Sequence, residues 1–172
     1  MNNDEQLRYP IGKLATQPER SVSENINLIA LLPAQIESIT SQLAGERKFD
    51  VAYRLGGWTA RQVIHHLADS HLNAYIRTKW MLTEQTPTIK PYDEKAWSLT
   101  PEVSADPMLS VHLLKALHDK WTILLEAIPD TDRAFLHPES GKHVRLDQLI
   151  ATYAWHGLHH VGHLKVIVKA PL

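Results

Sequence analysis

The 172-residue chain contains no cysteine. This absence excludes disulfide bonds, zinc sites built from thiolates, c-type haem attachment and a cysteine nucleophile. Any metal that the chain binds must therefore be held by imidazole or carboxylate groups. A thiolate, if the chemistry needs one, has to arrive with a second substrate.

The chain also lacks an excess of charge of one sign, and it lacks long apolar runs. The formal net charge is −1, so no basic field attracts nucleic acid. No apolar run reaches the roughly 18 residues of a transmembrane helix, and the first residues lack the basic and apolar regions of a signal peptide. We expect a cytoplasmic protein that binds neither nucleic acid nor membrane. Its length predicts a single domain over residues 1–172.

The spacing of apolar residues predicts an all-α fold with four long helices. The predicted helices cover residues 23–44, 60–83, 107–125 and 147–168. Capping boxes precede the first two, with Ser21 and Glu24 in one and Thr59 and Gln62 in the other. Asp106 and Pro107 form a start signal for the third helix, and Pro33 predicts a kink in the first. We expect a four-helix bundle with long connections.

Three other segments carry local signals. Residues 1–20 contain Tyr9-Pro10-Ile11-Gly12 and Pro18, which predict an extended N-terminal arm that wraps the body. Residues 86–107 contain four prolines and are too long for a tight turn, and loops of this length often line a functional site. Pro138-Glu139-Ser140-Gly141 lies between short apolar runs and predicts a small β-hairpin before the last helix.

Seven of the eleven histidines fall in two clusters. The later cluster, His156, His159, His160 and His163, contains two overlapping pairs whose members would lie one helical turn apart. At 100° per residue all four project from one stripe of the last predicted helix, so we expect them to face the core or a cavity. A shared metal ion would offset the cost of burying several imidazoles without partners. Spacing alone does not choose between the pair His156/His160 and the pair His159/His163.

A third ligand has to come from the earlier cluster of His65, His66 and His71. His65 and His66 are adjacent and diverge by about 100° on a helix, so only one can face a shared metal. Val63 and Leu67 mark the apolar edge beside which His66 lies, and this favours His66 weakly. Three imidazoles from two helices form an open site, with a position left for water or substrate. Zinc suits such ligands, and nickel and iron(II) are alternatives.

Four segments together resemble the YfiT family, which belongs to the DinB-like group of metal-binding four-helix proteins. They are Tyr9-Pro10-Ile11-Gly12, residues 56–71, residues 90–97, and Trp155-His156 with His159-His160. The resemblance covers nearly the whole chain and implies a four-helix bundle, a homodimer and one divalent metal per subunit held by three histidines. Carried over by position, these ligands are His66, His156 and His160. Leu158 stands where the family has a further histidine, which is not a ligand.

The resemblance implies two activities. Members of the family are described provisionally as metal-dependent hydrolases, whereas related DinB-like proteins are transferases that use a low-molecular-weight thiol such as bacillithiol. We expect a hydrolase in which zinc, or alternatively nickel, activates water to attack a small-molecule substrate. The alternatives are a thiol S-transferase with the same metal, a non-catalytic metal-binding protein, and haem ligation by two histidines.

Three further residues are candidates for catalytic roles beside the metal. Asp69 follows His66 by one helical turn and could accept a hydrogen bond from the ring N–H of a ligand. Tyr92, in the long connection, could close over the site as an acid or a substrate contact. His163 lies on the same stripe as the proposed ligands.

Overall fold

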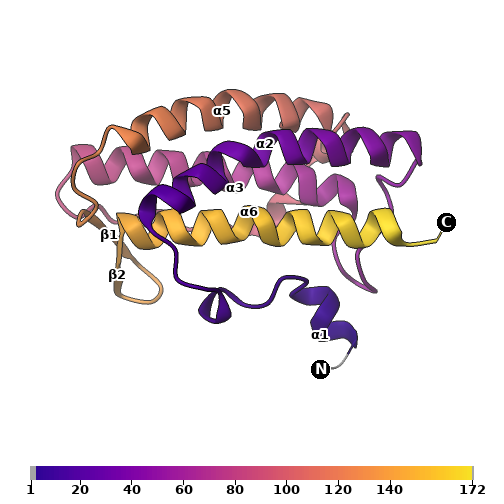
Figure 1. Ribbon diagram of the computed structural model, residues 1–172, viewed down its shortest axis with the longest axis horizontal. Coiled ribbons are helices and arrows are strands. Elements are labelled where there is room, and N and C mark those ends of the chain that lie inside the picture. Colours follow the sequence, from indigo (N-terminus) through magenta and orange to yellow (C-terminus); the bar gives the residue numbers. More distant parts are fainter. Residues whose placement is uncertain (1–2, 172) are drawn as a thin grey trace.

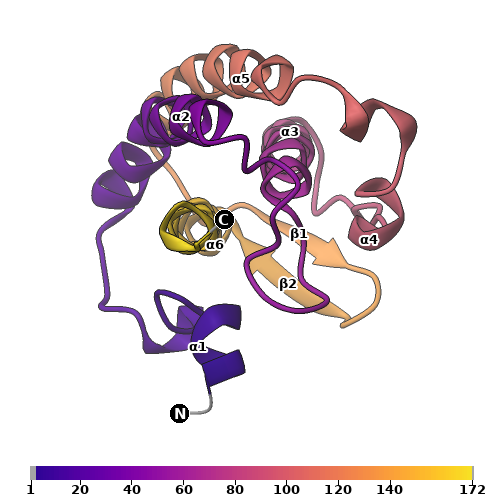
Figure 2. The same ribbon diagram turned by 90° about the vertical axis from the view of Figure 1, so that its right-hand side faces the viewer.

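The computed structural model describes residues 3–171, and four long helices dominate it (Figure 1). They are α2 (Val22–Gly45), α3 (Ala60–Thr83), α5 (Met108–Glu126) and α6 (Leu146–Lys169). In the end-on view of Figure 2 they form a bundle, in which α2 and α3 each pack against both α5 and α6. The predicted all-α four-helix bundle is confirmed.

The predicted start signals begin three of these helices. Ser21 Oγ accepts the backbone N–H of Glu24, and Glu24 accepts the backbone N–H of Ser21 in return. Thr59 and Gln62 form the same reciprocal pair at the start of α3. Asp106 Oδ1 accepts the backbone N–H of Met108 at 2.9 Å, so the third helix begins one residue later than predicted. Each cap satisfies backbone donors that have no partner inside the helix.

Pro33 lies within α2 and does not end it. Figure 1 shows the first turns of α2 inclined to the rest of the helix, as the predicted kink requires. Proline has no N–H, so the carbonyl of Ile29, four residues earlier, loses its helical donor. Ile29 is 1% exposed, and this carbonyl therefore needs a partner from elsewhere in the core.

The N-terminal arm wraps the body as predicted but is not extended throughout. Residues Asn3–Arg8 form the short helix α1, and Leu14–Thr16 form the 3₁₀ turn η1. Asp4 lies in the first turn of α1 and Arg8 in its last, and their side chains pair at 3.6 Å across one turn. These charges favour a helix because they oppose the helix dipole, a signal that the proline-based prediction did not weigh. The indole Nε1 of Trp155 donates to the Gly12 carbonyl and ties the arm to α6.

Two connections flank the bundle. The long one between α3 and α5 contains α4 (Glu94–Trp97) and the 3₁₀ turn η2 (Pro101–Ser104). The short strands β1 (Ala134–His137) and β2 (Lys142–Arg145) pair in antiparallel fashion before α6, which confirms the predicted hairpin. Gly141 closes its turn with φ +64°, a conformation that side chains disfavour. Thr88 forms a parallel bridge with Leu136 and attaches the long connection to this hairpin.

The apolar core consists of two clusters separated by histidines. One cluster includes Leu43, Leu67 and Leu164, and the other includes Met81 and Leu125. Along α3, α5 and α6 the two clusters lie on opposite sides of buried imidazoles, which are those of His71, His118 and His160. The middle of the bundle is therefore a polar layer inside an otherwise apolar interior.

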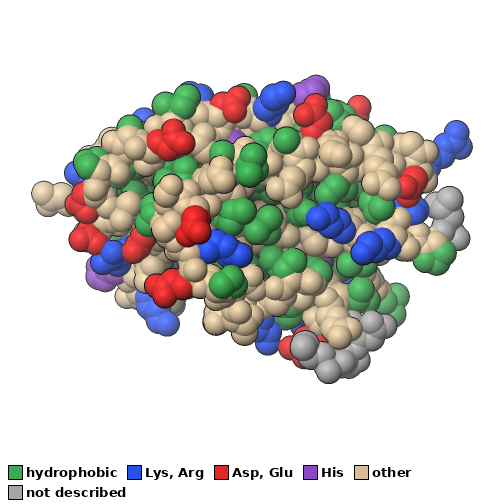
Figure 3. Space-filling view, viewed as in Figure 1, with side chains coloured by type: hydrophobic (Ala, Val, Ile, Leu, Met, Phe, Trp, Pro, Cys, Tyr) green, Lys and Arg blue, Asp and Glu red, His purple; other side chains and the backbone are tan. Residues whose placement is uncertain are grey.

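The surface shows mixed charge. Acidic and basic side chains are interspersed over the face drawn in Figure 3, in agreement with the near-neutral net charge. None of the helices within residues 3–171 combines the length and the apolar character needed to cross a membrane.

Gly157 sets the approach of α2 to α6, which provides a test of this packing. A Cβ at this position would lie 2.5 Å from Leu32 Cδ2, so Gly157→Ala should lower the free energy of unfolding by about 1–3 kcal/mol. Gly45→Ala is the matched control, because a Cβ there would meet nothing within 4 Å and should be neutral or stabilising. Denaturant unfolding measures both. Equal stability of the two variants would contradict the close packing.

Candidate metal centre

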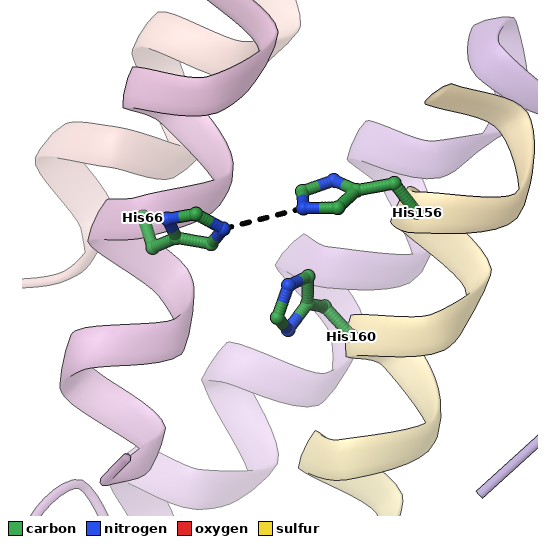
Figure 4. Close-up of side chains that lie close together, drawn as sticks. All are labelled: His66, His156 and His160. Atoms are coloured by element: carbon green, nitrogen blue, oxygen red, sulfur yellow. Dashed lines mark hydrogen bonds between the residues drawn. The ribbon is translucent and has the colours of Figure 1, made fainter. Parts of the chain in front are cut away.

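Three imidazole rings converge between two helices. His66 projects from α3, and His156 and His160 project from successive turns of α6 into the same space (Figure 4). Their possible ligand atoms all lie within 4.8 Å of one another. The Nε2 atoms of His66 and His156 are 3.2 Å apart. Two nitrogens bound tetrahedrally to zinc at 2.0–2.1 Å lie about 3.3 Å apart, so this spacing fits a shared metal ion.

The structure distinguishes His66 from its neighbour. His65 is buried but turns toward α5, where its Nδ1 lies 2.8 Å from Ser110 Oγ. The weak preference that helix periodicity gave to His66 thus agrees with the geometry. Within residues 3–171, one group of three histidine or carboxylate residues has its possible ligand atoms all within 4.8 Å of one another, and its members are His66, His156 and His160.

Burial keeps the three rings in the form that binds metals. It lowers the pKa of His66 to about 4, and it lowers the pKa of His156 and His160 well below the usual 6.5. Proximity adds to this effect, since a charge on one ring would repel a charge on the next. At neutral pH the imidazoles are therefore uncharged and each retains one nitrogen lone pair.

A cavity of about 740 Å³ opens onto these rings. Its walls come from the N-terminal arm, from the loop before α3 and from the α4 segment. The long connection thus lines the site, as predicted. Three cationic side chains, those of Arg8, Arg54 and Lys95, share the lining with one acidic side chain, Glu94. Arg8 and Arg54 both pair with Asp4, at 3.6 and 3.7 Å, so a single positive charge remains in excess. This excess favours a ligand that carries an anionic group.

His163 and His159 lie beside the three rings. His163 lines the cavity, stacks on Tyr53 with ring centroids 3.9 Å apart, and has its Nδ1 3.3 Å from Nδ1 of His160. Its Nε2 lies 3.1 Å from the Arg8 carbonyl of the arm. His159 stacks on Trp155, and its buried Nδ1 has no hydrogen-bond partner among the described residues. Both histidines therefore border the site without joining the group of three.

The other two catalytic candidates lie outside the cavity lining. Asp69 is half-buried on α3, where burial raises the pKa of its carboxyl to about 6. Burial also raises the pKa of Tyr92. The Tyr92 hydroxyl is enclosed and has no hydrogen-bond partner among the described residues. Neither side chain lines the cavity or joins the three imidazoles.

Sequence reasoning missed one pair of residues. His71 Nε2 lies 3.2 Å from Nδ1 of His156, and His71 Nδ1 lies 3.0 Å from Nε2 of His118. His71 was placed in the earlier histidine cluster without an assigned contact, and His118 was not considered. The signal for His118 is its position four residues after Leu114 and three before Trp121, on the buried face of α5.

Comparison with known proteins identifies the family of this chain. A model of the DinB superfamily matches residues 29–164. YfiT of Bacillus subtilis (strain 168) is 43% identical over 166 residues, which cover 92% of each chain. A protein of Oceanobacillus iheyensis is 45% identical over 167 residues, which cover 94% of this chain and 96% of that protein. The chain belongs to the YfiT family of the DinB superfamily.

The names of both relatives assign them provisionally to the metal-dependent hydrolases. The solved structure of Bacillus subtilis YfiT, described as having "an unusual four-helix bundle topology", matches with a TM-score of 0.87. The two chains are 41% identical, and the match covers 94% of this chain and 95% of that one. The fold and the family that the sequence resemblance implied are therefore confirmed.

The buried histidines predict how the stability of this YfiT-family protein depends on pH. Burial is the largest cause of a lowered pKa at eight of them. Between about pH 6.5 and pH 4 the unfolded chain binds more protons than the folded chain, so stability should fall as the pH is lowered through this window. His118 alone, with its pKa lowered to about 4, should account for a loss of about 3 kcal/mol in the free energy of unfolding across this window.

Denaturant unfolding of metal-free protein at several pH values measures this slope. His118→Gln should reduce it by up to about one proton, and a variant of the exposed His112 on the same helix is the matched control. Stability that does not change between pH 4 and 6.5 would contradict the burial of neutral imidazoles.

Proposed function

We propose that this protein is a metal-dependent hydrolase that holds one divalent cation with His66, His156 and His160. The convergence of three uncharged imidazoles at the wall of a cavity of about 740 Å³ is the observation that carries the proposal. When bound, a divalent cation would lower the pKa of coordinated water to about 7, which would make a nucleophile available at neutral pH. The provisional names of the relatives support the same activity.

The residues around the three histidines have separate tasks in this proposal. Trp58 packs against His66 with ring centroids 4.6 Å apart and shields one side of the site from water. Arg54 and Lys95 line the cavity and would hold an anionic group of the substrate. His163, which is also at the cavity wall, remains the candidate for a proton-transfer role.

An open site supports catalysis over a purely structural role. Structural zinc sites fill four positions with protein side chains, whereas catalytic sites use three and keep one position for water or substrate. Among residues 3–171 no fourth histidine or carboxylate joins the group of three. This count favours a hydrolase over the alternative of a non-catalytic metal-binding protein.

We propose zinc as the metal, with nickel as the alternative. Three imidazole nitrogens without a thiolate or a carboxylate suit either ion. The 3.2 Å separation between two of the ring nitrogens supports tetrahedral coordination, which zinc adopts readily.

A thiol S-transferase is the second candidate function. A metal that acidifies water also acidifies a bound thiol, and a chain without cysteine has to take the thiol from a cosubstrate. The cationic side chains in the cavity lining favour this candidate, since low-molecular-weight thiols such as glutathione carry carboxylates.

A homodimer remains part of the proposal. Four exposed large hydrophobic side chains lie on the adjacent helices α2 and α5, and such residues are typical of surfaces that a second chain covers. They are Leu31, Leu109, Leu113 and Ile123.

The ligand assignment predicts which variants lose the metal. His156→Ala and His66→Ala should each reduce bound metal from about one ion per chain to nearly none, because each removes one of three ligands. His65→Ala, which removes the adjacent histidine facing Ser110, should retain it. Elemental analysis of protein purified without an affinity tag gives the answer. Equal loss in His65→Ala and His66→Ala would overturn the choice between the two.

A turnover assay separates water from thiol as the nucleophile. Metal-loaded protein is incubated with a chromogenic ester and with a chromogenic electrophile, each with and without bacillithiol or glutathione. We expect ester cleavage without thiol, and loss of that activity in His156→Ala. Product formation only in the presence of thiol would reject the hydrolase and support the transferase.

A further inference from the structure

A chain of hydrogen bonds runs from α2 through two buried histidines to the ligand His156. His118 Nδ1 lies 2.7 Å from the carbonyl oxygen of Ile29. His118 Nε2 lies 3.0 Å from His71 Nδ1, and His71 Nε2 lies 3.2 Å from His156 Nδ1. His71 is 0% exposed and His118 is 1% exposed, so water does not compete for these bonds.

The direction of the first bond follows from backbone chemistry. A carbonyl oxygen can only accept, so Nδ1 of His118 must carry the proton. Pro33 makes this carbonyl available, because the residue four positions after Ile29 has no N–H to donate to it. Burial also lowers the pKa of His118 to about 4, so at neutral pH its second nitrogen carries no proton.

Each later bond then has only one direction. A neutral imidazole has one donor and one acceptor nitrogen. His118 Nε2 therefore accepts from Nδ1–H of His71, and His71 Nε2 accepts from Nδ1–H of His156. With its proton on Nδ1, His156 keeps a lone pair on Nε2, the atom that lies 3.2 Å from His66 Nε2.

We propose that His71 and His118 are positioning residues that hold His156 as the Nδ1–H tautomer, with Nε2 directed at the metal site. The Ile29 carbonyl, which can only accept, sets the direction of every hydrogen bond in the chain. This inference rests on the metal site of the proposed function. Ligating histidines commonly donate their other N–H to a carbonyl or a carboxylate, and here two further imidazoles bridge that distance.

The second α6 ligand shows the same pattern on the other side of the site. His163 Nε2 lies 3.1 Å from the Arg8 carbonyl, and its Nδ1 lies 3.3 Å from Nδ1 of His160. By the same reasoning His163 accepts from Nδ1–H of His160, which leaves Nε2 of His160 with its lone pair. Both ligands of α6 are thus connected through histidine to a backbone oxygen.

The tautomers can be measured in the metal-free, full-length protein. Long-range proton–nitrogen NMR correlations of isotope-labelled histidine rings, assigned with single-histidine variants, report which nitrogen carries the proton at neutral pH. We expect Nδ1–H for His118, His71 and His156. A proton on Nε2 of neutral His71 or His156 would overturn the proposal. The measurement needs neither a bound metal nor any activity.

Metal affinity tests the consequence. His118→Phe keeps an aromatic ring but removes the acceptor that faces His71, and it should weaken zinc binding by about 10- to 100-fold in competition with a chelator. His118→Gln retains an acceptor and should recover most of the affinity. His112→Phe, at an exposed position of α5, is the matched control and should bind zinc as the wild type does.

The outcomes separate positioning from packing. Wild-type affinity in His118→Phe overturns the proposal, and so does equal weakening in the Phe and Gln variants with the tautomer of His71 unchanged. If His118→Phe does not fold, the tautomers of the wild-type protein decide. A wild-type protein that binds no divalent metal would reject the proposed function, while those tautomers would still test the hydrogen-bond chain.

Discussion

The hydrogen-bonding requirement of buried imidazole governs the interior of this protein. A buried ring nitrogen without a partner costs about 1–3 kcal/mol, and the middle of the bundle buries several imidazole rings. The structure reduces this cost by pairing rings with one another and with backbone carbonyls. The ring nitrogens of His66, His156 and His160 that face one another are those that a cation would satisfy. The polar layer and the division of the core into two apolar clusters have the same origin.

Local sequence signals predicted the elements because those signals act within one turn or one hairpin. The capping residues Ser21 and Thr59 begin their helices, and the turn before Gly141 closes the hairpin. The contact between His71 and His118 joins α3 to α5 across 47 positions of the chain. No pattern within one helix specifies how another helix crosses it, so this part of the site could not be derived from spacing. The ion pair of Arg8 with Asp4 is local, and weighing it would have predicted α1.

Helices supply the metal ligands of the site, and connecting segments supply most of its walls. The three imidazoles project from the long helices α3 and α6, whose packing fixes their separation. The arm, the loop before α3 and the α4 segment supply the walls of the cavity. Helices hold metal ligands with precision, and loops tolerate change in length and composition. Periodicity could therefore indicate the two histidine clusters, and the family resemblance chose three ligands among them, whereas neither carried information on the substrate.

Both hydrogen-bond chains end on main-chain oxygens, those of Ile29 and Arg8. A main-chain oxygen is present whatever amino acid occupies the position. Mutation at residues 8 and 29 therefore leaves each terminal acceptor in place, provided that the backbone keeps its course. A search for invariant side chains would pass over both anchors, even though the orientation of two rings depends on them. The protein thus anchors both chains on atoms that no substitution at residue 8 or residue 29 removes.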